Sequence, residues 1–321
     1  RDTSIKVIEN NLKFNHAWAG GINAGQFNEM DINLDGEKDL IVFDRSGNKL
    51  IPFIKKNNQY VFAPKYKDLF PKLRDWVIFA DYNCDGKNDI YSYSSSGIAI
   101  FENTSSSNLS FSLVTQLVFS NYGSLNTNIF VSPVDIPAIV DIDNDGDLDI
   151  LTFKITGGFI EYHKNLAMEL TGNCDTVAFK LESGCWGNFY EGLNNYTLNC
   201  QNCQCPPITG GNNTKQKHAG STLLCFDIDN DNDKDLILGD VSFNNLNLII
   251  NGGNSQNANM ISVDSLFPSN TSNTIAVDMD IFPAAFYLDV NSDGKKDLIV
   301  TSNSENNSEN FESCWMYENI G

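Results

Sequence analysis

One nine-residue pattern occurs five times in this chain, with an acid at position 1, Asp or Asn at position 3, Asp at positions 5 and 9, and Gly or Asn at position 6. Positions 1, 3, 5 and 9 offer oxygen ligands and position 6 permits a tight turn, which is what Ca²⁺ needs to be wrapped by one short loop. The backbone carbonyl of position 7 would complete the ligand set. One copy would mean little in an Asp-rich chain, but five copies in one frame predict five calcium loops.

The loops are numbered here in chain order, and the predicted ligands occupy positions 1, 3, 5, 7 and 9. They are Asp31, Asn33, Asp35, Glu37 and Asp39 in loop 1; Asp81, Asn83, Asp85, Lys87 and Asp89 in loop 2; Asp141, Asp143, Asp145, Asp147 and Asp149 in loop 3; Asp227, Asp229, Asp231, Asp233 and Asp235 in loop 4; and Asp289, Asn291, Asp293, Lys295 and Asp297 in loop 5. Loop 4 has Asn232 at position 6, and we expect it to close because Asn tolerates a positive φ. Loops 3 and 4 carry Asp at positions 1, 3, 5 and 9, so ligand charge predicts tighter binding there.

The residues around the loops exclude an EF-hand, which needs Glu at position 12 and a helix beyond it. Position 12 holds Val42, Ser92, Thr152, Leu238 and Val300. Short apolar or β-branched stretches follow the loops, and similar stretches precede them, as at 77–80 and 138–140. Such runs bounded by turn residues predict strands. We therefore expect each loop to connect the two strands of a β-hairpin.

The spacing of the loops predicts the architecture. The loops start 50, 60, 86 and 62 residues apart, and each is followed by a further apolar stretch that ends in Asn57, Asn103, Asn165, Asn251 or Asn319. A fourth strand is visible in several units, as at 60–62. About four short strands per unit of roughly 50 residues is typical of a propeller blade. The predicted fold class is all-β, a β-propeller of four-stranded blades with a calcium loop between the first two strands of each of five blades.

These residues resemble the FG-GAP/VCBS repeats that build integrin-α-type propellers, where the calcium loop joins the first two strands of a blade. The stretches 19–23, 43–47, 135–141 and 218–224 are also similar to secreted propellers found among cargo of the bacterial type IX secretion system. The resemblance implies a secreted protein or one on the outer cell surface, with type IX secretion or outer-membrane components as potential partners. The sorting domain that usually ends such cargo is missing from this sequence.

Composition narrows the choice of partners. The net charge is −20 and the isoelectric point is near 4.3, which argues against nucleic acid or an anionic membrane surface. No apolar run is long enough to span a membrane. Residues 1–321 are expected to belong to one propeller rather than to several domains, because blades do not fold alone. Arg1 stands where an initiator Met would be and no signal peptide is present, so we expect a mature or trimmed product, or a fragment.

Cysteine is concentrated between loops 3 and 4. The candidates for disulfides are Cys174, Cys185, Cys200, Cys203 and Cys205, while Cys84, Cys225 and Cys314 lie in or beside predicted strands. The Cys200–Cys205 spacing could also suit zinc or redox chemistry, but no second Cys/His pair stands at finger spacing. For a secreted chain disulfides are the favoured interpretation, and residues 168–217 are predicted to form a loop-rich, stapled insertion. The sequence leaves the connectivity open.

Two classes of function remain. The favoured one is a calcium-stiffened module that binds a protein or glycan ligand, with structural calcium and no catalytic residue. The alternative is a carbohydrate-active enzyme, a polysaccharide lyase on the same ring, for which His16, His163 or His218 could act as base. A histidine at the rim or in the core is the favoured interpretation of each. Fold alone does not choose between the two classes.

The end of the chain raises the question of ring closure, because the last predicted strand, at 315–317, lacks a fourth strand after it. Either residues 5–8 supply that strand and close a ring of five blades, or the native chain continues. The favoured expectation is continuation, with residues 1–321 forming an incomplete arc of a larger ring.

Overall fold

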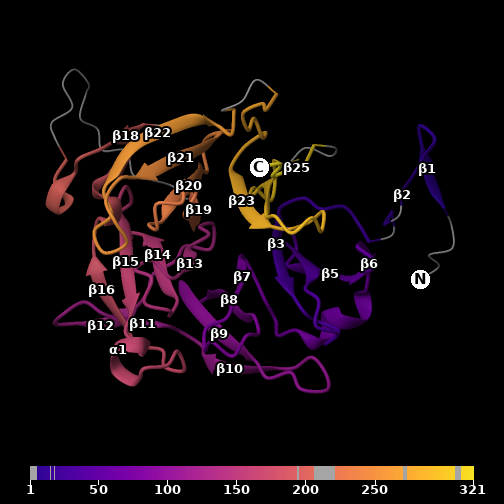
Figure 1. Cartoon of the computed structure of the whole chain (residues 1–321), viewed down its shortest axis with the longest axis horizontal. Helices are drawn as coiled ribbons and strands as arrows, with labels where there is room; N and C mark the ends of the chain where they lie inside the picture. Colours follow the sequence, from indigo (N-terminus) through magenta and orange to yellow (C-terminus); the bar gives the residue numbers. More distant parts are fainter. Residues whose placement is uncertain are drawn as a thin grey trace.

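The computed structural model describes residues 6–14, 16–17, 19–193, 195–205, 221–269, 273–307 and 312–321. In these residues the fold is all-β, and five sheets are arranged as the blades of a propeller around one axis (Figure 1). Three blades have four strands in consecutive antiparallel order: β3 (Gly25–Met30), β4 (Asp39–Asp44), β5 (Lys49–Lys56) and β6 (Gln59–Phe62) in blade 1; β7 (Val77–Ala80), β8 (Asp89–Ser94), β9 (Gly97–Asn103) and β10 (Phe111–Thr115) in blade 2; β19 (Ser221–Phe226), β20 (Asp235–Asp240), β21 (Leu246–Asn251) and β22 (Met260–Phe267) in blade 4. The predicted all-β propeller with four-stranded blades is confirmed.

The other two blades depart from the four-stranded plan. Blade 3 has four strands, β13 (Ala138–Val140), β14 (Asp149–Phe153), β15 (Ile160–Asn165) and β16 (Phe179–Ser183), extended by β11 (Phe119–Asn121) and β12 (Asn126–Asn128). Blade 5 has three strands in the described residues, β23 (Pro283–Leu288), β24 (Asp297–Ser302) and β25 (Cys314–Tyr317). Strand β16 lies inside the predicted insertion 168–217, so that boundary needs correction: residues 179–183 pair with β15 and belong to the blade.

Short elements lie outside the blades. They are the hairpin of β1 (Val7–Glu9) and β2 (Leu12–Phe14), the pair β17 (Tyr190–Glu191) and β18 (Tyr196–Thr197), the helix α1 (Ala167–Thr171) and the 3₁₀ turns η1 (Pro64–Leu69), η2 (Trp186–Asn188) and η3 (Gln201–Cys203). No helix of the described chain is both long and apolar enough to cross a bilayer.

The core consists of the faces between blades. The second strands β4, β14, β20 and β24 are buried along their whole length, because a blade packs against a neighbour on each face. Five clusters of buried apolar side chains fill these faces. One of them joins Val42 and Phe53 of blade 1 to Leu288 and Ile299 of blade 5. First and last blades are therefore packed together.

Further contacts between blades 1 and 5 show how the ring is closed. Strand β23 contacts β3, and the hydroxyl of Thr301 in blade 5 donates a hydrogen bond of 2.6 Å to the carbonyl of Gly25 in blade 1. The expected incomplete arc is wrong, since five blades form the ring. The alternative closure by residues 5–8 is wrong too for its described part, because Val7 and Ile8 pair with β2 and not with β25, while Ile5 lies outside the described residues.

Candidate metal-binding loops

The five predicted loops share one backbone cage. In each, the position 1 carboxylate accepts hydrogen bonds from the N–H groups of positions 5 and 6, at 2.8 to 3.2 Å. The position 5 carboxylate accepts from the N–H of position 7, at 2.8 to 3.1 Å. The side chains at positions 1 and 5 therefore point into the turn in every copy, as the sequence pattern predicts.

Two positions of each loop have left-handed backbone. At position 6, φ is 91° at Gly36 and 72° at Asn232, so Asn232 does adopt the conformation expected of it. At position 4, φ is between 60° and 65° in all five loops, at residues that include Leu34, Cys84 and Asn230. The sequence analysis missed position 4, because four different residue types other than Gly occupy it and only Asn hints at a positive φ.

The position 9 aspartates fasten each loop to its blade. One oxygen of each accepts the N–H of position 2, at 2.8 to 3.3 Å. The other accepts the N–H of a residue at the end of the third strand, at 2.6 to 3.0 Å, namely Lys55, Asn103, Asn165, Asn251 or Asn319. All five aspartates are buried. Oδ2 of Asp149 also accepts the Tyr162 hydroxyl at 3.1 Å. The other oxygens keep one further lone pair beside these bonds, so this role is compatible with metal coordination.

The donor set fits a hard cation. In loops 3 and 4 the carboxylate oxygens of positions 1, 3 and 9 lie within 4.8 Å of one another. Burial, with repulsion from Asp143 and Asp147, raises the pKa of Asp149 to about 8, and burial with repulsion from other loop carboxylates raises the pKa of Asp89 to about 6. Collecting these charges costs free energy unless a cation neutralises them. Oxygen-only donors are the preference of Ca²⁺ and Mg²⁺.

Position 7 separates loops 3 and 4 from the others. The side chains of Glu37 and Lys295 are exposed, while Asp147 and Asp233 are buried. Asp147 accepts the N–H of Met168 at 2.9 Å. Neither carboxylate oxygen of Asp233 has a hydrogen-bond partner within the described part of the chain. Only the carbonyl of position 7 was predicted as a ligand, and these two carboxylates add donors that the sequence analysis missed.

Loop 3 contains a cation of its own. The ammonium of Lys164, at the end of β15, pairs with Asp143, with Asp145 at 3.2 Å and with Glu169 of α1 at 2.6 Å. Asp143 and Asp145 are ligand positions 3 and 5. Burial disfavours the charge on Lys164, but its hydrogen bonds to these carboxylates outweigh burial and raise its pKa. The sequence analysis missed Lys164, which lies 15 residues beyond the loop.

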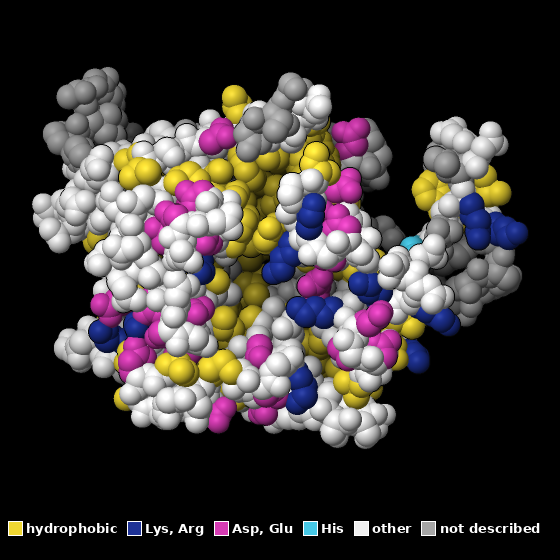
Figure 2. Space-filling model, viewed as in Figure 1, with side chains coloured by type: hydrophobic (Ala, Val, Ile, Leu, Met, Phe, Trp, Pro, Cys, Tyr) yellow, Lys and Arg dark blue, Asp and Glu magenta, His cyan; other side chains and the backbone are white. Residues whose placement is uncertain are grey.

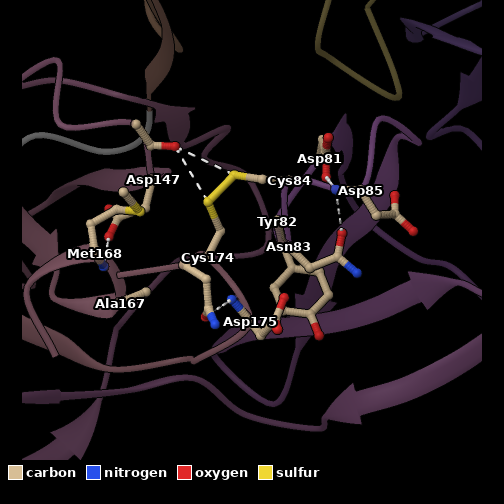
Figure 3. Close-up of a disulfide and its surroundings, with 12 residues drawn as sticks. Asp81, Tyr82, Asn83, Cys84, Asp85, Asp147, Ala167, Met168, Cys174 and Asp175 are labelled. Atoms are coloured by element: carbon tan, nitrogen blue, oxygen red, sulfur yellow. Dashed lines mark hydrogen bonds between the residues drawn. A yellow bond between two sulfur atoms is a disulfide. The ribbon is translucent and has the colours of Figure 1, made fainter. Parts of the chain in front are cut away.

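Neighbouring loops touch each other. Cys84, at position 4 of loop 2, forms a disulfide with Cys174, and both sulfur atoms lie 3.4 to 3.5 Å from the carbonyl oxygen of Gly146 in loop 3 (Figure 3). Asn144 of loop 3 donates to the carbonyl of Asn232 in loop 4 at 2.9 Å. Loops 2, 3 and 4 thus form a continuous row on one face of the ring.

The disulfides confirm the five cysteine candidates and add one that was missed. Cys185 pairs with Cys203 and Cys200 pairs with Cys205, so a zinc site at these residues is not what the structure shows. Cys84 was placed with the strand cysteines, and its partner is 90 residues away in sequence. Three disulfides are typical of proteins in an oxidising, extracellular environment.

The ring axis offers no catalytic grouping among the described residues. An axial cavity of about 240 Å³ is lined by the inner strands, mainly with apolar side chains such as Val77, Ile139 and Phe286, and by no His, Arg or Lys. His163 is fully buried, its Nδ1 lies 2.9 Å from the Ser120 hydroxyl, and burial lowers its pKa to about 4. His16 packs edge-on against Phe53, and His218 lies outside the described residues.

Comparison with known proteins was made for sequence and for structure. Residues 81–152 match the FG-GAP-like repeat. This segment runs from the first residue of loop 2 through loop 3 into β14, so it contains two of the five candidate loops. No curated protein sequence matches the chain.

Two solved structures illustrate the structural similarity. An Agrocybe aegerita lectin, described as recognising non-reducing terminal N-acetylglucosamine, is 14% identical with a TM-score of 0.44, and the alignment covers 94% of this chain and 87% of the lectin. The Photorhabdus luminescens Tc holotoxin pore is 14% identical with a TM-score of 0.39, and the alignment covers 91% of this chain but 11% of the toxin chain. Neither likeness bears on what this chain binds.

Proposed function

We propose that this protein is an extracellular calcium-binding propeller that presents a rigid surface to a protein or glycan ligand. The observation that carries the proposal is the backbone cage repeated in all five loops, which turns the carboxylates of positions 1 and 5 into the turn each time. Calcium would neutralise carboxylates that otherwise repel one another within a loop. Each loop in turn connects the first two strands of a blade. The metal is structural in this proposal.

The secretion route is proposed on sequence resemblance alone. Stretches such as 43–47 and 135–141 are similar to type IX secretion cargo, and the three disulfides support an oxidising destination. We therefore place the protein outside the cell or on its outer surface, where free calcium is abundant enough for sites of modest affinity, with Kd of about 10⁻⁴ to 10⁻³ M.

A cleft on blade 1 is the proposed contact for the ligand. Its volume is about 930 Å³, and Lys49, Lys67 and Lys72 line it together with apolar residues such as Phe62 and Pro71. Residues 1–75 contain twelve of the chain's 21 basic residues but ten of its 41 acidic ones. Figure 2 shows the dark-blue side chains gathered on the side of the molecule that carries β5 and β6. The net charge of the whole chain conceals this local excess of positive charge, which suits a ligand bearing acidic groups.

Thermal unfolding with and without calcium tests the metal. At ten times Kd one site adds about 1.4 kcal/mol, so several sites together would contribute a large part of a typical stability of 5–15 kcal/mol. We expect chelation with EDTA to lower Tm by well over 10 °C and calcium to restore it. Magnesium at the same concentration is the control, because it seldom accepts an all-protein cage. An unchanged Tm after chelation would refute the proposed role of calcium.

Binding to panels of acidic and neutral glycans and peptides tests the cleft. Lys67→Glu is expected to weaken binding of an acidic ligand at least fivefold, because it reverses a charge at the cleft. Lys180→Glu, on the exposed face of blade 3, makes the same charge change away from it. Equal effects of the two variants would remove the cleft from the proposal. Release of unsaturated sugars from a bound polysaccharide would instead favour the lyase alternative.

A further inference from the structure

We propose that loop 3 is filled by the side chain of Lys164 and takes up no calcium at concentrations that saturate the other four loops. The inference rests on the proposed function, since it concerns how the five loops share that role. It also departs from the ordering predicted from ligand charge alone, in which loop 3 is among the tightest sites.

The first step is the position of the ammonium. Lys164 reaches Asp143 and Asp145, the position 3 and 5 ligands, and its side chain is 16% exposed. A calcium ion coordinated by these two carboxylates would have to displace an ammonium that is covalently tethered beside them. It would also be repelled by the positive charge of the ammonium, which stays nearby. Glu169 completes a cage of three carboxylates around the ammonium.

The second step compares the same position in the other blades. Lys164 directly precedes Asn165, whose N–H bonds to the position 9 aspartate of loop 3. The residues that directly precede the matching N–H donors in the other four blades are Ile54, Glu102, Ile250 and Glu318. None of these side chains can supply a positive charge. In loop 2 the exposed Lys87 pairs with Asp85 alone, at 2.9 Å. An ammonium that comes from the third strand and reaches both position 3 and position 5 is therefore a property of loop 3 among the described residues.

The third step is that loop 3 has fastenings that a metal would otherwise provide. The N–H of Met168 in α1 bonds to Asp147, and the Cys84–Cys174 disulfide lies against the carbonyl of Gly146. Met168 and Cys174 belong to the segment that follows β15, and Cys84 belongs to loop 2. A loop held by an ion pair, a helix and a disulfide keeps its shape without calcium.

Calcium stoichiometry tests this directly, by isothermal titration and by metal analysis after dialysis of the full chain. We expect four ions per chain in the wild type and five in Lys164→Met, with the fifth site gaining at least tenfold in affinity. Lys164→Arg keeps the charge and should stay at four. Lys154→Met removes a lysine of the same blade that follows β14 at the end opposite to loop 3, and should also stay at four.

A second substitution locates the extra ion. Asp141→Asn removes the position 1 carboxylate of loop 3, so it should return Lys164→Met to four ions and leave the wild-type count unchanged. Circular dichroism and gel filtration verify that each variant is folded. Five ions in the wild type, or four in Lys164→Met, would overturn the inference while leaving the proposed function intact. Absence of calcium from every variant would overturn the proposed function and this inference with it.

Discussion

Asp89 accepts a hydrogen bond of 2.6 Å from the backbone N–H of Asn103, 14 residues further along the chain. Its second oxygen accepts the N–H of Tyr82 at 2.8 Å. The carboxylate therefore joins the start of the loop to the end of the third strand, and the equivalent aspartate does the same in the other four blades. This bridge is built from protein atoms alone, so it acts whether or not a metal is bound.

Asp89→Asn should lower the free energy of unfolding by about 1–3 kcal/mol, because the NH2 group that replaces one carboxylate oxygen cannot accept a hydrogen bond and one buried N–H loses its partner. The measurement is urea unfolding in EDTA, which separates this effect from metal binding. Asp68→Asn, at an exposed position of η1, is the matched control and should change little. Equal stability of the two variants would show that the bridge contributes nothing.

Without calcium, stability should fall as pH rises. Burial raises the pKa of Asp149 to about 8, and burial with repulsion from other loop carboxylates raises those of Asp147 and Asp233 to about 6. A carboxyl whose folded pKa is raised stabilises the fold below its unfolded value of about 3.9, and this contribution is lost as pH rises through the folded pKa. Unfolding in EDTA should therefore show stability decreasing between pH 5 and 8, and calcium should remove the part of that decrease that comes from Asp233 of loop 4. A pH-independent stability in EDTA would contradict the proposed crowding of charge.

Removal of the Cys84–Cys174 disulfide should cost more than removal of Cys200–Cys205. The first closes a separation of 90 residues and the second one of 5. Loop-closure entropy predicts a loss of about 2–4 kcal/mol for the long bridge and less for the short one. Paired Cys→Ala variants compared by thermal unfolding measure both losses. A larger loss for Cys200→Ala with Cys205→Ala would mean that native-state contacts, and not chain entropy, dominate.

Leu34→Asn should stabilise loop 1 by up to about 1 kcal/mol. Leu34 has φ of 62°, which Asn adopts at lower cost than Leu. The reverse change, Asn230→Leu in loop 4 with φ of 63°, should destabilise by a similar amount. Urea unfolding of both variants in saturating calcium gives the comparison. Shifts of the same sign would mean that side-chain contacts outweigh the backbone preference.

The loops were predictable because their determinants lie within nine residues of one another. Ligand positions, the turn at position 6 and the flanking strands all follow from local chemistry, and strands such as β7 and β13 have the predicted bounds. Contacts between residues that are far apart in the sequence could not be predicted from it. The partner of Cys84, the ammonium of Lys164 in loop 3 and the use of residues 179–183 as a blade strand depend on how the chain returns to itself.

The expectation of an open ring failed for a related reason. The local sequence pattern gives the number of repeats but not the angle between successive blades. That angle determines whether five blades form a closed ring. In the structure, Val42 and Phe53 of blade 1 pack against Leu288 and Ile299 of blade 5, so the ring is closed with five blades. A bare edge on β25 was taken as a sign that the ring was open, yet the blades close through their inner strands and faces, and the outer strand of blade 5 plays no part in the closure.

The bond from Thr301 to Gly25 spans 276 residues, and this has a consequence for synthesis. At translation rates of about 5–20 residues per second, blade 1 would wait roughly 15–55 s after leaving the ribosome before its partner emerges. During that time its face of Val42 and Phe53 has no native neighbour. A fold with such distant contacts forms slowly, so nascent chains of this protein should depend on a chaperone, or remain unfolded, until the final blade is made.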